Sequence, residues 1–115
     1  MIMEQKLMLK ENVMKLIMDK FDSNETLSIL KSNPSIFLSW GVERIFDVEG
    51  RGLMLKVNGH FHNGWVLITL GWDDYYRVHF LTKFGEVLDS FEGVCFDELV
   101  RIIDVRIEWV DEYEF

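Results

Sequence analysis

Apolar and polar side chains alternate between residues 53 and 70 with the two-residue period of a β-strand. Two Asn-Gly pairs, at residues 58–59 and 63–64, could supply a turn, because both residue types tolerate the positive φ of a type I′ turn. A turn at 63–64 keeps apolar residues opposite one another, whereas a turn at 58–59 pairs Val57 with His60 and mixes the faces. The pattern therefore predicts a central hairpin that turns at 63–64.

In this register the hairpin has one apolar and one mixed face, as expected for an antiparallel sheet that covers a core. The apolar face carries Leu53, Leu55, Val57, Gly59, Phe61, Val66, Ile68 and Leu70. The mixed face carries Lys56, Asn58, His60, His62, Trp65, Leu67 and Thr69. We expect the apolar face to form the core and any functional residues to lie on the mixed face.

Further strands extend the hairpin into an antiparallel meander, because the connections are short. They are predicted over residues 42–49, 75–82 and 86–91. A turn at Gly50-Arg51 would pair Phe46 with Leu55 and continue the apolar face.

The strand at residues 75–82 directs Tyr76, Val78 and Phe80 toward the core. Gly85 suits the left-handed position of the hairpin loop that follows. Gly93 is expected to end the sheet.

Helical spacing of apolar residues predicts three helices, over residues 3–21, 25–32 and 95–110. Ser23 or Asn24 would cap the second helix, and Pro34 would end it. The apolar stretch at residues 35–41 is expected to pack as a linker over one end of the core. The last helix would bury a seam of Phe96, Leu99, Ile103, Ile107 and Val110. The chain thus predicts an α+β fold: two N-terminal helices, a five-stranded antiparallel meander and a C-terminal helix packed on the sheet.

The length of 115 residues fits a single domain over residues 1–115, and 49% hydrophobic residues are enough for a core. Cys95 is the one cysteine, so no intrachain disulfide can form, which suits a reducing cytoplasm. Charged residues recur at short intervals near the N-terminus, and no uncharged apolar run reaches the ~18 residues of a membrane span. We therefore expect a cytoplasmic protein.

The net charge of −8 argues against binding to nucleic acid, which requires a basic surface, and against binding to an anionic membrane. It would suit a basic protein partner.

Three histidines, His60, His62 and His79, project from the mixed face in the predicted register. A His-x-His pair on a strand places two imidazoles on one side, which zinc sites use, and Asp73 or Asp74 could replace His79 as the third ligand. The alternative is three solvated histidines on an exposed face. No phosphate loop, serine-nucleophile motif or His-Glu metal motif occurs in the sequence, so we expect no catalytic residue and no cofactor.

An aromatic outer surface is the more informative feature of the mixed face. Trp65, Leu67, Tyr75 and Leu81 share this face, and Trp72 lies in the adjacent turn. Exposed apolar patches mark interfaces, and Trp and Tyr are favoured anchors. The alternative is that the first helix covers this face and gives a three-layer fold, and the sequence leaves both arrangements open.

Three runs, at residues 37–42, at 56–59 with 64–66, and at 93–100, make the chain similar to small uncharacterised bacterial proteins, some of them carried on mobile elements. The resemblance implies a bacterial, cytoplasmic accessory role and brings no known activity, cofactor or catalytic residue.

These observations together predict a non-enzymatic protein-interaction module. Its partner would be another protein or a second copy of the chain, bound through the aromatic face or the methionine-rich first helix. One alternative is an acidic inhibitor of the immunity or nucleic-acid-mimic type, acting through its net charge and its acidic tail at residues 111–114. The other is a metal-binding domain built on the three histidines.

Overall fold

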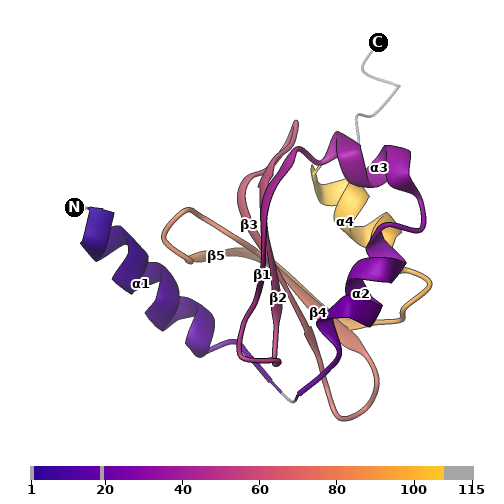
Figure 1. Cartoon of the computed structure of the whole chain (residues 1–115), viewed down its shortest axis with the longest axis horizontal. Helices are drawn as coiled ribbons and strands as arrows, with labels where there is room; N and C mark the ends of the chain where they lie inside the picture. Colours follow the sequence, from indigo (N-terminus) through magenta and orange to yellow (C-terminus); the bar gives the residue numbers. More distant parts are fainter. Residues whose placement is uncertain (1, 19, 108–115) are drawn as a thin grey trace.

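A computed structural model describes residues 2–18 and 20–107 and contains one antiparallel sheet with helices on both faces (Figure 1). The strands are β1 (Val42–Asp47), β2 (Leu53–Asn58), β3 (Asn63–Leu70), β4 (Tyr76–Leu81) and β5 (Val87–Val94), in the spatial order β1-β2-β3-β4-β5. The helices are α1 (Ile2–Met14), α2 (Ser23–Leu30), α3 (Pro34–Ser39) and α4 (Leu99–Ile107). In Figure 1, α1 lies on one side of the sheet and the other three helices lie on the opposite side. The α+β class and the antiparallel meander are confirmed, although three helices rather than two precede the sheet.

The first helix is shorter than the predicted span of residues 3–21. It ends at Met14, and the chain then leaves the helical path to reach the turn between β1 and β2. There the Phe21 backbone N–H donates to the Gly50 carbonyl oxygen at 2.9 Å. A contact with a distant turn thus competes with the helical pattern, which local spacing does not reveal.

Side-chain caps set the start of the two short helices before the sheet. Asp22, not the predicted Ser23 or Asn24, accepts the backbone N–H groups at the start of α2. Asn33 caps α3, and Pro34 at its first turn has the φ that a helix requires. The stretch expected to be a linker is therefore helical.

The last helix begins at Leu99, later than the predicted residue 95. Leu99, Ile103 and Ile107 are fully buried, as predicted. Phe96 is 65% exposed, because it precedes the helix instead of joining its buried seam. The end of the predicted helix and the acidic tail fall on residues 108–115, which lie outside the described residues.

The central hairpin turns through a loop at residues 59–62, not at residues 63–64. β2 and β3 pair Asn58 with Asn63 and Leu55 with Val66. The observed register differs from the predicted one by an even number of residues, so the strand residues keep their predicted faces.

Long-range contacts explain this different turn. The Phe61 backbone N–H donates to the Ile107 carbonyl oxygen at the end of α4, at 2.6 Å. Phe61 is therefore in a loop and 49% exposed, not part of the apolar face as predicted. Gly64 lies in β3, where a Cβ would come 2.3 Å from the Leu81 carbonyl oxygen. Close approach of β4, not the turn, requires this glycine.

The first strand is one residue away from its predicted register. The turn is centred on Glu49 and Gly50, which have φ values of 53° and 66°, one residue earlier than expected. Phe46 consequently lies opposite Met54 rather than Leu55. A one-residue change moves a side chain to the other face, so Phe46 lies on the α1 side of the sheet.

The predictions for β4 are confirmed, whereas the end of the sheet is not where we expected it. Tyr76, Val78 and Phe80 belong to the larger core. Gly85 has a φ of 87° in the hairpin loop, as predicted. Gly93, with a φ of 62°, lies inside β5 beside a register shift and does not end the sheet.

Two apolar cores lie on opposite sides of the sheet. The larger one packs against α2, α3 and α4 and contains Trp40, whose Nε1–H donates to Asp104 at 3.0 Å. The smaller one packs against α1 and consists of Val13, Met54, Trp65, Leu67 and Leu81, with partly buried neighbours. Of the two arrangements that the sequence left open, the structure therefore has the three-layer one.

No helix among the described residues has the length and apolarity to cross a membrane.

Candidate functional site: a groove along the β1 edge

The five residues expected to form an aromatic outer surface do not form one patch. Trp65 is 8% exposed, and Leu67 and Leu81 are fully buried in the core under α1. Trp72 and Tyr75 are 84% and 43% exposed at the turn between β3 and β4. Of the predicted interface residues, therefore, three build the smaller core and two lie apart from it on the surface.

The three histidines predicted on one face lie in different surroundings. The ring of His62 packs against Phe80 of the larger core, with centroids 5.4 Å apart. His79 lies on the opposite face, with its Nδ1 2.7 Å from Ser90 Oγ. Because His60 and His62 belong to the hairpin loop, the alternation of a strand does not apply to them. The three imidazoles therefore do not converge on one metal position.

One compact group of potential metal ligands occurs within the described residues. Ligand atoms of Cys95, Asp97 and Glu98 lie within 4.8 Å of one another before α4. Desolvation and the Glu98 carboxylate raise the pKa of the Cys95 thiol, which disfavours the thiolate that a metal would need. We assign no metal to this group, which the sequence analysis did not identify.

A groove lies between α1 and the edge strand β1, on the face of the sheet against which α1 packs. It encloses about 490 Å³. It is lined by Leu9, Lys10, Val13, Met14, Arg44, Phe46, Asp47, Val48, Glu49, Met54 and Trp65. Phe46 is 45% exposed, and its ring centroid lies 5.7 Å from that of Trp65. A concave apolar surface with a few charged groups is typical of binding sites.

Contacts at two corners of the sheet fix α1 across it. Asn12 Nδ2 donates to the Phe84 carbonyl oxygen at 2.8 Å, in the loop between β4 and β5. Leu16 and Ile17 pack against the smaller core, and Ile17 lies with Val48 beside Gly52, in the connection between β1 and β2. α1 thus runs obliquely over the sheet and leaves the apolar strip beside β1 open, which forms the groove.

Among the described residues no strand pairs with the outer side of β1, because β1 is the first strand in the sheet order. The Val48 N–H donates to the Gly52 carbonyl oxygen at 2.7 Å, which fixes the phase of the ladder. Alternation then turns the backbone groups of Arg44 and Phe46 toward β2. The N–H and C=O of Ile45 point outward and can accept a further strand.

A second hollow follows β1 on the opposite face of the sheet, beside α3. It encloses about 360 Å³ and is lined by Phe37, Leu38, Gly41, Val42, Glu43, Arg44 and Ile45. Ile45 and Phe46 are 39% and 45% exposed. They are neighbours in sequence and so point to opposite faces. The β1 edge is therefore apolar on both sides, with a hollow on each.

Charged residues differ between the two ends of the first groove. Arg44 lies toward the start of β1, and Lys10 lies one helical turn before Met14 on the adjoining helix. Glu49 lies at the end near the turn to β2, where the Asp47 carboxylate accepts from Ser23 Oγ and from the Gly50 backbone N–H. One end of the groove is thus basic and the other acidic.

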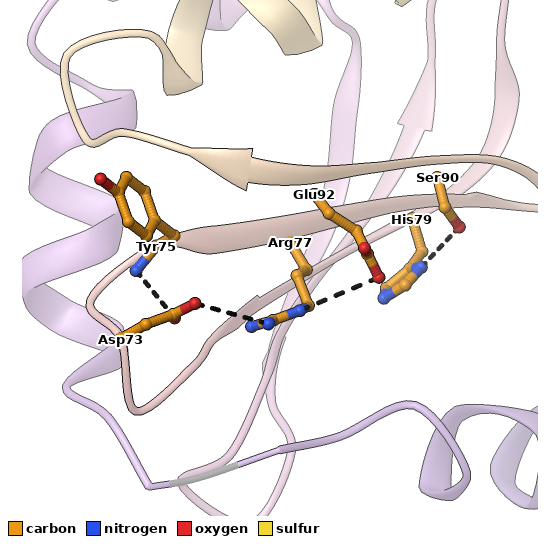
Figure 2. A network of polar contacts seen from close by, with 6 residues as sticks. All are labelled: Asp73, Tyr75, Arg77, His79, Ser90 and Glu92. Carbon is orange, nitrogen blue, oxygen red and sulfur yellow. Dashed lines mark hydrogen bonds and ion pairs between the residues drawn. The ribbon is translucent and has the colours of Figure 1, made fainter.

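A polar cluster lies on the same face of the sheet as α1, in the part that α1 does not reach (Figure 2). Arg77 Nη2 lies 3.7 Å from Asp73, and Arg77 Nε lies 4.0 Å from Glu92. His79 and Ser90 form the hydrogen-bonded pair beside them. The cluster joins the turn after β3 to β4 and β5.

The serine–histidine pair in this cluster is part of what nucleophilic catalysis uses, but that chemistry also needs a group that orients the imidazole. The neighbouring carboxylate, Glu92, is paired with Arg77, and its side chain is 76% exposed. Desolvation lowers the pKa of His79, so the ring is neutral at physiological pH. We therefore assign no reaction to the cluster. Sequence reasoning placed His79 on the mixed face but missed Ser90 as its partner, because the register of β5 could not be predicted.

Comparisons with protein-family models, with curated proteins and with solved structures find no match to this chain. The resemblance to small bacterial proteins and the cytoplasmic location therefore stay predictions. So does the acidic-inhibitor hypothesis, whose tail lies outside the described residues.

Proposed function

We propose that the protein is a non-enzymatic protein-interaction module that binds a segment of another protein in the groove between α1 and β1. The observation that carries the proposal is the groove itself, in which Phe46 stays almost half exposed above the nearly buried Trp65. An aromatic side chain left exposed in a concave apolar surface gains free energy when a partner covers it, on the order of 25 cal/mol for each Å² of apolar area.

The groove also has the composition of an interface centre. Aromatic and methionine side chains, which interface cores favour, line it together with one arginine. Charged side chains lie at its ends rather than in its floor, so binding would desolvate few charges.

A matched pair of variants tests the proposal. Phe46→Glu puts a charge into the groove, whereas Phe96→Glu puts the same charge at an exposed phenylalanine elsewhere. Peptide ligands are first selected on the full chain from a phage library of random peptides about ten residues long, which is enough for a strand. We expect Phe46→Glu to weaken binding of the most enriched synthetic peptide about tenfold or more, and Phe96→Glu to leave it unchanged.

Two outcomes would contradict the proposal. Either no peptide is enriched over a surface carrying the Phe46→Glu variant, or the enriched peptides bind both variants equally. Thermal unfolding of the two variants checks that each is folded, as expected for changes at positions that are already partly exposed.

A further inference from the structure

The geometry of β1 points to the form of the ligand, on the basis of the proposed function. We infer that the bound segment is extended and joins the sheet as an additional strand beside β1, with alternate side chains in the two hollows. This mode of recognition derives affinity from backbone hydrogen bonds and specificity from pockets for alternate side chains.

The backbone of β1 supplies the first part of the argument. The outward N–H and C=O of Ile45 have the spacing that an adjacent strand uses, and Asp47 continues the same phase. A register shift between Val42 and Arg44 interrupts the strand at residue 43. A bulge of this kind protects an edge from indiscriminate pairing, so an added strand would pair over residues 44–47.

The side chains of β1 supply the second part. In an added strand, residues opposite Arg44 and Phe46 would point into the groove under α1, while a residue opposite Ile45 would point into the hollow beside α3. A helix laid along the edge could fill one hollow but not both, because its apolar stripe faces one direction. Two hollows on opposite faces of one strand therefore favour an extended occupant.

The other edge of the sheet, β5, differs from β1 in its charges. β5 exposes Val87, Leu88 and Phe91, but its acidic residues include Asp89, which is paired with Arg106 of α4 at 2.6 Å. No basic residue lies in β5, whereas Arg44 lies in β1. Both β1 and its groove therefore offer charges of either sign to a partner, and the β5 edge offers acidic ones.

The charges of the groove specify the ligand further. Lys10 and Arg44 would pair with an acidic residue, and Glu49, near the turn to β2, would pair with a basic one. The expected ligand is thus an extended segment with apolar residues pointing to both faces, flanked by an acid toward Arg44 and a base toward Glu49.

Removing one outward hydrogen-bond donor tests the inference. Ile45→Pro deletes the N–H that faces away from β2, and proline is tolerated at such edge positions. Ile45→Ala is the matched control, because it also lacks the isoleucine side chain but keeps the N–H. The probe is the most enriched synthetic peptide from the phage library, and its affinity is measured by fluorescence anisotropy. We expect Ile45→Pro to bind it roughly five- to tenfold more weakly than Ile45→Ala does.

Equal affinities of the two Ile45 variants would overturn strand addition, and enriched peptides with helical rather than two-residue spacing would do the same. Both results would leave the proposed function intact if Phe46→Glu still weakened binding as expected. Loss of all peptide selection would reject the proposed function and the inference together. A dimer in sedimentation that Phe46→Glu dissociates would show that a second copy, not a foreign segment, occupies the edge.

A second measurement applies if Ile45→Pro lowers the unfolding temperature sharply. Hydrogen exchange at the Ile45 amide of the unmodified protein is then compared with and without the peptide. Strand addition predicts that the peptide slows this exchange at least about tenfold, because the free amide is open to solvent and the bound one is hydrogen-bonded. Unchanged exchange in the peptide complex would overturn the inference.

Discussion

Two buried histidines lie on opposite faces of the sheet and are surrounded by different groups. Desolvation lowers the pKa of His62, and the nearby Arg106 and Lys56 lower it further, while the hydrogen bond to the Trp65 carbonyl opposes the shift. Desolvation also lowers the pKa of His79, which Glu92 opposes. Both rings are therefore held neutral in the folded protein.

This protonation state predicts how stability depends on pH. A lowered pKa means that the unfolded chain binds protons which the folded protein does not, so the free energy of unfolding falls as pH falls through the ordinary histidine value of about 6.5. We expect the melting temperature to fall between about pH 7.5 and about pH 6. The melting temperature of the His79→Gln variant should fall less over this range, because the substitution removes one of the two buried histidines.

Equal slopes of melting temperature against pH in the unmodified protein, His79→Gln and His62→Gln would contradict the account of the buried rings.

Individual residues were predictable where strand alternation applied and not where a loop intervened. Trp65 and Leu67 lie on the face that the two-residue period assigned to them. His62 does not, because a hydrogen bond between Phe61 and the end of α4 helps to hold the loop, and these residues are far apart in sequence. The metal hypothesis depended on the alternation that this loop breaks.

At the scale of elements, α1 determines which residues of the mixed face are buried and which stay accessible to a partner. It buries Leu67 and Leu81 completely and leaves the groove beside β1. Val13 is 2% exposed and is the buried residue that α1 contributes to the smaller core among the described side chains. The docking of α1 therefore depends strongly on this position.

Val13→Asp should detach α1 while the rest of the fold persists. A buried carboxylate among apolar side chains costs about 2 kcal/mol or more, and the larger core does not include Val13. Hydrogen exchange should accelerate in α1 but not in β3 and β4. Peptide binding should be lost, because one wall of the groove is gone.

Lys15→Asp, at an exposed position just after α1, is the control and should change neither exchange nor binding. Simultaneous loss of protection in α1, β3 and β4 on Val13→Asp would show that the two cores unfold as one unit, against this account.

The elements themselves were largely predictable, but their ends and registers were less so. Apolar spacing predicted the five strands and the buried seam of α4. It missed α3, because a cap by Asn33 and a first-turn Pro34 convert an apolar linker into a helix. It also misplaced β1 by one residue, and this change moves Phe46 from the core into the groove.

At the scale of the whole molecule, the sheet separates a closed side from a partly open one. The larger core is sealed by three helices, whereas a single oblique helix covers the other side. The sequence predicted which residues face each side but could not decide how much of the second side a helix would cover. Coverage depends on the angle of α1, which is set by distant contacts such as that of Asn12 with Phe84.

The most direct test of the account is a map of amide chemical-shift changes when the enriched peptide is added to isotope-labelled protein. The account predicts that the largest changes fall on residues 44–46 of β1 and residues 9–14 of α1, the two walls of the groove. Largest changes at the exposed turn of Trp72 and Tyr75, or along β5, with β1 and α1 unaffected, would contradict it.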